Sequence, residues 1–185
     1  MHVENTKLSG CVIIHNDIFT DERGFFLESY NKKKLESLLN YSINFVQDNQ
    51  SFSQKGTLRG LHFQMGKSAQ TKLVSVISGA VLDVAVDLRK DSPTFKQYIA
   101  IELNETNKWQ LLIPRGFAHG FLVLSNYAFF QYKCDNFYDK SAESGIIFND
   151  PEIHIDWQLP TNNLIVSEKD KQLKKLSSLH PSHLF

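Results

Sequence analysis

The chain has 185 residues, 42% of them hydrophobic and 14 of them phenylalanine, which is enough apolar material for one domain over residues 1–185 with a buried core. Its 20 basic and 20 acidic residues cancel, so the basic excess of a general nucleic-acid binder is absent. The most apolar stretch, residues 73–86, is too short and too polar to span a bilayer, and the first ten residues lack the apolar core of a signal peptide. Cys11 and Cys134 are expected to be reduced thiols, which fits a cytoplasmic protein without nucleic-acid or membrane partners.

Short strands dominate the elements predicted along the chain, and turn residues separate them at roughly ten-residue spacing. This spacing favours an antiparallel sandwich or barrel, so the predicted fold class is mainly β. One helix is expected over residues 33–40 with Asn31 as its cap, and another begins after Ser167, within residues 168–176. Residues 177–185 show no pattern, and we expect them to be mobile. The predicted strands are 11–14, 57–63, 72–77, 81–88, 98–103, 110–113, 120–124 and 129–133.

The predicted strand over residues 58–64 carries a histidine beside irregular neighbours. Strict alternation puts His62 and Gln64 on one face and Arg59 on the other, together with apolar side chains. A bulge or a bend at Gly60 would remove this irregularity.

A second histidine follows a tight turn, in which Pro114 and Gly116 deliver His119 to the start of the next strand. The two histidine strands resemble the two motifs of the cupin superfamily of β-barrels. Metal-binding cupins have His-x-His in the first motif, whereas this chain has Gln64 in place of the second histidine. A transition metal usually needs three or more protein ligands, and only His62 and His119 remain unless another part of the chain supplies one. The resemblance therefore implies a cupin-type barrel without a metal or another cofactor.

A larger set of motifs runs through the chain: 21–28 (DERGFFLE), 47–49 (QDN), 58–64 (LRGLHFQ), 83–89 (DVAVDLR), 92–95 (SPTF), 113–121 (IPRGFAHGF), 131–133 (QYK), 149–151 (NDP) and 167–170 (SEKD). In this order they resemble the dTDP-4-dehydrorhamnose 3,5-epimerase family. The resemblance implies a jelly-roll barrel, a homodimer with shared active sites, and a cofactor-independent isomerase acting on a dTDP-4-keto-6-deoxy sugar.

The implied reaction inverts C3 and C5, the carbons beside the C4 ketone of dTDP-4-dehydro-6-deoxy-D-glucose, on the route to dTDP-L-rhamnose. Inversion needs a base, a group that stabilises the enolate, and an acid on the opposite face. The resemblance implies His62 as the base, Asp170 as the carboxylate that orients it, Tyr132 as the acid, and Lys72 beside the enolate or a phosphate. The residues alone leave other roles open: a buried strand histidine, a helix-capping acid, a packed aromatic and a solvated lysine.

The resemblance also assigns the nucleotide end of the substrate. Arg23 and Arg59 are expected to contact the diphosphate, because guanidinium groups suit phosphate oxygens, and Tyr138 is expected to stack on thymine. Residues 23–28 would come from the partner subunit. The complete predicted substrate-binding set is Arg23, Phe26, Glu28, Gln47, Asp48, Asn49, Arg59, His119, Tyr138, Glu143 and Lys169.

Four other functions remain open at this point. A relative on the same scaffold could invert only C3 or only C5, since the orientation of the sugar decides which proton reaches the base. The others are a 3,4-ketoisomerase, a metal-dependent cupin oxygenase, and a cupin that only binds a sugar or nucleotide. The set of His62, Tyr132 and Asp170 argues against the last, because a binding protein has no need for an acid and a base together.

Overall fold

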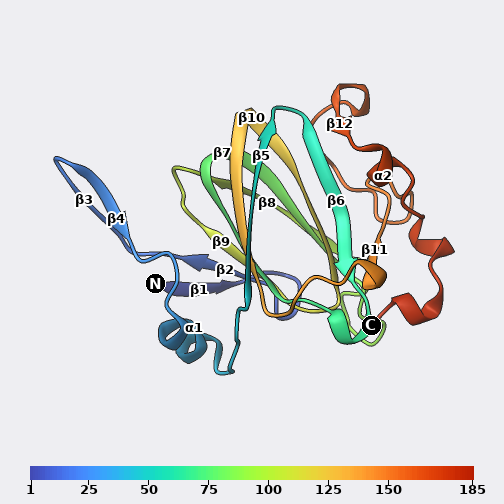
Figure 1. The fold of residues 1–185 in the computed structure, drawn as a ribbon, viewed down its shortest axis with the longest axis horizontal. Helices are drawn as coiled ribbons and strands as arrows, with labels where there is room; N and C mark the ends of the chain where they lie inside the picture. The colour runs from blue at the N-terminus through green and yellow to red at the C-terminus, as the bar shows by residue number, and fades with distance from the viewer.

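The computed structural model describes residues 1–185, apart from the side chain of Thr161, and strands dominate it (Figure 1). Within these described residues, ten strands belong to one sheet that curls into a barrel, and two form a separate hairpin. The mainly β prediction is therefore confirmed, and no described helix is long and apolar enough to cross a membrane. The strands are β1 (His2–Asn5), β2 (Val12–His15), β3 (Ile18–Asp21), β4 (Gly24–Leu27), β5 (Gln47–Gln54), β6 (Thr57–Gln64), β7 (Lys72–Asp87), β8 (Tyr98–Asn104), β9 (Gln110–Ile113), β10 (Phe117–Cys134), β11 (Glu143–Gly145) and β12 (Ile165–Val166). The helices are α1 (Lys32–Leu39) and α2 (Glu168–Lys171), with 3-10 turns at Gly66–Ser68, Lys140–Ala142, Thr161–Asn163, Leu176–Ser178 and Pro181–His183.

Strands β7 and β10 connect the walls of the barrel, because each of them pairs with one strand along its first part and with another along its second part. The first part of β7 pairs with β9 and its second part pairs with β8, while β10 pairs first with β6 and then with β5. The sequence predicted two strands in each place, with turns at residues 78–79 and 125–126. The chain bends there instead: Gly79 has φ 86°, and the Ser125 hydroxyl accepts a hydrogen bond from the Ala80 N–H at 2.8 Å. Each bend turns a strand from one wall into the next without ending it.

Apolar side chains fill the barrel and also cover its outside. Val74 and Phe130 belong to a buried cluster of residues from the facing walls, whereas Leu73 packs outward with Leu35 of α1. A third cluster joins the β6 wall to the C-terminal part of the chain, which includes Trp157. This last contact holds the C-terminal segment beside β6, where the functional site lies.

The first predicted helix is confirmed as α1, since the Asn31 side chain accepts a hydrogen bond from the Lys34 N–H at 3.1 Å. The second is shorter than predicted and ends at Lys171. Beyond it the chain forms a β-bridge at Lys174 instead of continuing as a helix. The chain end, for which mobility was predicted, lies against the barrel, where the ring of Phe185 is 6.0 Å from that of Phe63.

Six strands were not predicted from the sequence: β1, β3, β4, β5, β11 and β12. Strand β5 has a polar sequence without apolar alternation, and it forms because all eight residues pair with β10. The hairpin of β3 and β4 extends away from the barrel on the side opposite α2 (Figure 1). Three of its rings are exposed: Phe19, Phe25 and Phe26.

Candidate active site

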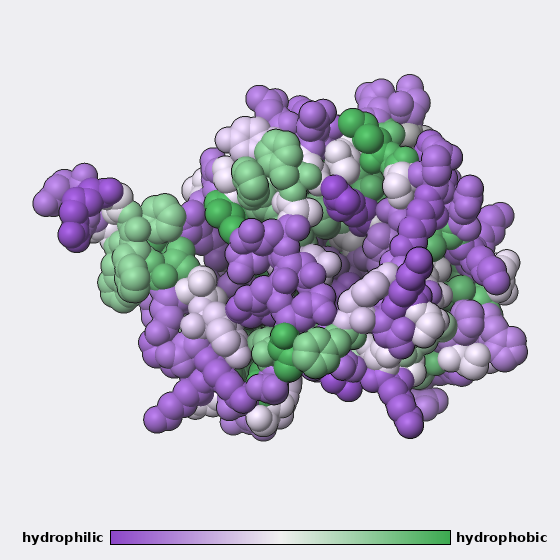
Figure 2. Space-filling view, in the orientation of Figure 1, coloured by the Kyte–Doolittle hydropathy of each residue, from purple (hydrophilic) through white to green (hydrophobic). Residues whose placement is uncertain are grey.

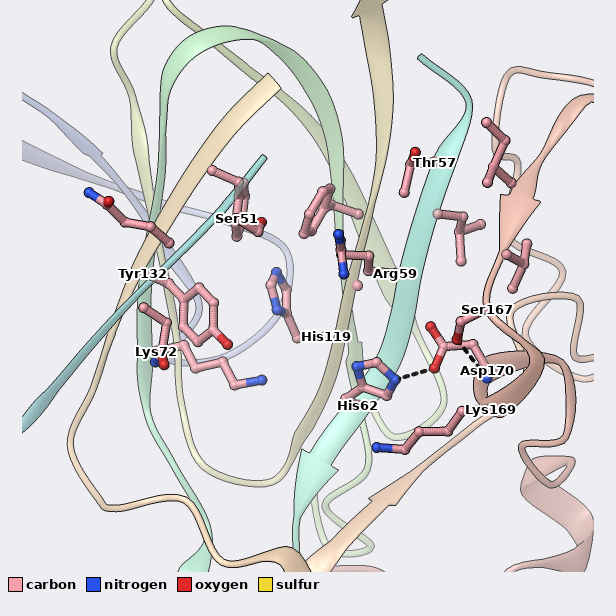
Figure 3. Close-up of a pocket in the computed structure, with 18 residues that line it drawn as sticks. Ser51, Thr57, Arg59, His62, Lys72, His119, Tyr132, Ser167, Lys169 and Asp170 are labelled. Atoms are coloured by element: carbon pink, nitrogen blue, oxygen red, sulfur yellow. Dashed lines mark hydrogen bonds and ion pairs between the residues drawn. The ribbon is translucent and has the colours of Figure 1, made fainter. Parts of the chain in front are cut away.

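A pocket of about 630 Å³ opens into the barrel, lined by β5, β6, β7, β10 and the segment from β12 to α2 (Figure 3). It brings together eight of the predicted site residues: Asn49, Arg59, His62, Lys72, His119, Tyr132, Lys169 and Asp170. The other seven do not line it: Arg23, Phe26, Glu28, Gln47, Asp48, Tyr138 and Glu143.

A bulge in β6 turns two functional side chains into this pocket. Arg59 and His62 both line it, although strict alternation would place them on opposite faces, and Leu61 between them is buried outside the barrel. The ladder between β6 and β10 shifts register at this point, so of the bulge or bend expected at Gly60 the strand forms a bulge. The backbones are so close here that a Cβ on Gly60 would lie 2.6 Å from the Cα of Gly120. Only glycine fits this crossing, because Gly60 also has φ 128°.

His62 is held by Asp170, whose side chain reaches it from α2. The Nε2 atom of His62 lies 2.7 Å from Oδ1 of Asp170, and Oδ2 accepts a hydrogen bond from the Gly60 N–H at 3.2 Å. Asp170 is only 4% exposed. Burial raises the pKa of this carboxyl, but the hydrogen bond and charge of His62 together with the hydrogen bonds of Gly60 and Ser167 outweigh burial, so its pKa falls below the ordinary value. An ionised Asp170 accepts the Nε2 proton, which leaves Nδ1 of His62 with a free lone pair on the pocket side (Figure 3).

Helix α2 places Asp170 with the help of its cap. The hydroxyl of Ser167 accepts a hydrogen bond from the Asp170 N–H at 3.1 Å, so Ser167 and not Asp170 caps this helix. The carboxylate of Asp170 is therefore free to turn toward the barrel.

Tyr132 and Lys72 stand across the pocket from His62, and their hydroxyl and ammonium groups point into the space between (Figure 3). The Nζ atom of Lys72 lies 5.8 Å from the centroid of the Tyr132 ring. Burial raises the pKa of Tyr132, which keeps the phenol protonated at neutral pH, and burial lowers the pKa of Lys72. A phenol and the amine of a lysine thus face the imidazole of His62 across the pocket.

A second histidine–carboxylate pair lies deeper in the barrel, where Nε2 of His119 is 2.9 Å from Oδ2 of Asp83. Burial lowers the pKa of His119 despite this carboxylate, so the ring is neutral near pH 7. Asp83 was not among the predicted site residues, although a carboxylate in so apolar a strand needs a buried partner. Among the described residues, no group of three or more His, Cys, Asp or Glu side chains could hold a metal. Gln64 accepts a hydrogen bond from the Asp139 N–H at 2.9 Å.

Several predicted ligand residues lie at the rim or beyond it. Glu143 accepts a hydrogen bond from the hydroxyl of Tyr138 at 2.9 Å and pairs with Lys169 at 2.6 Å. Gln47 accepts a hydrogen bond from the Tyr138 N–H at 3.0 Å, whereas Asp48 pairs with Lys133. These contacts tie the rim together, but they place only Lys169 in the pocket.

The three predicted residues of the N-terminal region lie away from the pocket. Arg23 pairs with Asp21 at the tip of the hairpin, and Phe26 is 69% exposed. Glu28 pairs with Lys34 of α1 at 2.7 Å. In this arrangement, the three side chains do not line the pocket of their own chain.

An oriented imidazole facing a phenol across a jelly-roll pocket defines an acid–base enzyme. Residues 5–178 match the model of the family described as dTDP-4-dehydrorhamnose 3,5-epimerase. The enzyme of that name from Escherichia coli is 50% identical over 179 residues, which cover 97% of this chain and 96% of the relative.

Two crystal structures are similar along nearly the whole chain. The dTDP-6-deoxy-D-glucose-3,5-epimerase of Legionella pneumophila, in complex with dTDP-4-keto-L-rhamnose, has a TM-score of 0.95 at 48% identity and covers 99% of this chain and 96% of that one. The dTDP-4-dehydrorhamnose 3,5-epimerase of Bacillus anthracis, with TDP and pyrophosphate bound, has a TM-score of 0.90 at 48% identity, with 94% and 98% covered. The chain belongs to the dTDP-4-dehydrorhamnose 3,5-epimerase family, and the predicted cupin-type fold is confirmed.

The Asp170 carboxylate makes the stability of the fold depend on pH. Because its pKa is lowered on folding, its contribution is present above the ordinary value of 3.8 and is lost as the pH falls through the lowered pKa. We expect Asp170→Asn to lower the free energy of unfolding by about 1–3 kcal/mol near neutral pH, through the loss of charged hydrogen bonds. In urea unfolding, the difference from wild type should shrink below pH 3.8. Glu168→Gln on the same helix is the control, and a difference for Asp170→Asn that stays constant with pH would contradict this account.

Proposed function

We propose that this chain is a 3,5-epimerase that converts dTDP-4-dehydro-6-deoxy-D-glucose into dTDP-4-dehydro-L-rhamnose, in dTDP-L-rhamnose biosynthesis. The observation that carries the proposal is the placement of a carboxylate-oriented imidazole and a protonated phenol on opposite walls of one pocket, with an ammonium group between them. Its family relatives bear the same activity in their names. The buried free thiols of Cys11 and Cys134 fit a reducing compartment such as the cytoplasm.

The chemistry follows from the ketone at C4, which acidifies the hydrogens on C3 and C5. Nδ1 of His62 removes one of these protons, and Asp170 stabilises the imidazolium that forms. The electron pair moves onto the C4 oxygen, where the ammonium of Lys72 stabilises the enolate. Tyr132 then donates a proton to the opposite face of the same carbon, which inverts it. His62 then releases its proton to solvent and Tyr132 regains one from solvent, so that repetition at the other carbon gives the doubly inverted sugar.

The nucleotide end of the substrate would lie toward the remaining cations of the pocket. Nε of Arg59 donates to the hydroxyl of Ser53 at 3.0 Å, which leaves the terminal nitrogens of the guanidinium for phosphate oxygens. Lys169 supplies a further positive charge, and the amide of Asn49 supplies hydrogen bonds. We therefore expect the diphosphate near Arg59 and the sugar between His62 and Tyr132.

The hairpin of β3 and β4 supports a homodimer with shared sites. Phe19 and Phe26 are 62% and 69% exposed, and Figure 2 shows the hairpin as an apolar projection with a polar tip. An exposed apolar projection of this kind favours burial against a partner. Arg23 lies at its tip, so a second copy of the chain is the partner whose pocket it would complete.

The test of the proposed function is hydrogen exchange in deuterated water. Incubation with dTDP-4-dehydro-6-deoxyglucose, followed by NMR, should show solvent deuterium at both C3 and C5 of the product. Since the proposed groups need no metal, exchange should persist in the presence of a chelator. Deuterium at only one carbon would indicate a mono-epimerase, and loss of exchange on chelation would overturn the metal-free mechanism.

Mixing two inactive variants tests the shared sites. His62→Ala and Arg23→Ala subunits, unfolded together and refolded, should regain activity, because each mixed dimer contains one intact site. Random pairing restores about a quarter of all sites. The control mixture of His62→Ala with Arg59→Ala should stay inactive, since both residues belong to the same pocket. Equal activity from both mixtures, or none from either, would contradict sharing of the hairpin.

A further inference from the structure

One carboxylate at the rim of the pocket, that of Glu143, joins three segments of the chain. Its Oε2 atom lies 2.9 Å from the hydroxyl of Tyr138 and 2.6 Å from Nζ of Lys169. Tyr138 belongs to the loop after β10, Glu143 begins β11, and Lys169 lies on α2. The side chain of Glu143 is 20% exposed, whereas Lys169 and Tyr138 are 61% and 50% exposed, so the shared acceptor is the shielded member of the three.

Each of the three segments leads to a different part of the site. Strand β11 pairs with β6 so that Gly145 stands opposite His62. Lys169 directly precedes Asp170, and Figure 3 shows its side chain running beneath His62. The loop of Tyr138 is fixed from the other side by Gln47. Glu143 therefore connects the strand of the base, the helix of its carboxylate and a loop at the rim.

The charges of the three groups suit this connection. Burial raises the pKa of Glu143, but the hydrogen bonds from Lys169 and Tyr138 lower it. The net pKa lies below the ordinary value, so the carboxylate is ionised at neutral pH. The hydrogen bond to Glu143 raises the pKa of Lys169 and of Tyr138, which keeps both groups protonated. Two donors thus share one acceptor.

A second ion pair on the same helix is a solvent-exposed surface pair and serves as a comparison. Lys171 pairs with Glu168 at 2.7 Å, but Glu168 is 80% exposed and neither residue lines the pocket. Exposed pairs of this kind contribute little to stability. The Lys171–Glu168 pair is therefore a suitable comparison for the contacts of Glu143.

We infer that Glu143 is a positioning residue, which holds α2 against β6 through Lys169 and so fixes the geometry between Asp170 and His62. The same carboxylate sets the direction of the Tyr138 ring. The expected kinetic effect rests on the proposed function. The expected structural effect concerns the hydrogen bond between His62 and Asp170. Small displacements of catalytic groups are costly, since a shift of about 1 Å can reduce a rate by about 10².

The test compares Glu143→Gln with Glu168→Gln, its matched control. Glu143→Gln should lower the rate of deuterium exchange at saturating substrate by about tenfold. It should also shift the proton resonance of the hydrogen bond between His62 and Asp170 in the free protein. Glu168→Gln should change neither, and the midpoint of thermal unfolding should be similar in both variants.

An unchanged resonance of the His62–Asp170 hydrogen bond in Glu143→Gln would overturn the inference, as would a higher KM at an unchanged saturated rate, which marks a direct substrate contact. Absence of exchange in the wild-type protein would instead refute the proposed function. The resonance would still decide whether Glu143 positions the pair.

Discussion

The hydrogen bond between His62 and Asp170 joins parts of the chain that are 108 residues apart, and much of the architecture serves to make it. His62 belongs to the barrel wall, whereas Asp170 belongs to a single helical turn that has little stability of its own. The apolar cluster between β6 and the C-terminal segment holds this turn in place, with the cap at Ser167 and the Gly60 N–H directing the carboxylate. A buried carboxylate would be unfavourable here without these partners.

The close crossing of β6 and β10 has a second consequence, since it decides which side chains share the pocket. With Gly60 and Gly120 in contact, the bulge turns Arg59 to the same side as His62. One strand can then serve both the phosphate-binding and the proton-transfer parts of the site. The continuous strand β10 carries His119 on one wall and Tyr132 on another, because it bends between them. Strand β10 thus contributes side chains to two walls of the same pocket.

Local sequence signals predicted the elements whose stability is local or whose apolar pattern is regular. Asn31 indicated the start of α1, and Gly60 indicated an irregularity in its strand. The motifs around His62 and Tyr132 indicated the pocket. The strand β5 could not be predicted from its polar residues, since its pairing with β10 is a long-range property. Bends at Gly79 and Ser125 look like turns in sequence, because the same residue types suit both. The contacts of Glu143 depend on three distant segments, so no pattern in the chain predicts them.

The central claim is that the base and the acid act from opposite faces of the sugar ring. Tyr132→Phe keeps the ring and its packing but removes the proton donor, while His62 can still take a proton and return one from solvent to the same face. The most direct measurement is the ratio of deuterium exchange to epimerised product in this variant, relative to wild type. The account predicts that the ratio rises, because exchange continues while inversion is blocked. An unchanged ratio, with both rates falling together, would contradict it and would assign Tyr132 to substrate positioning.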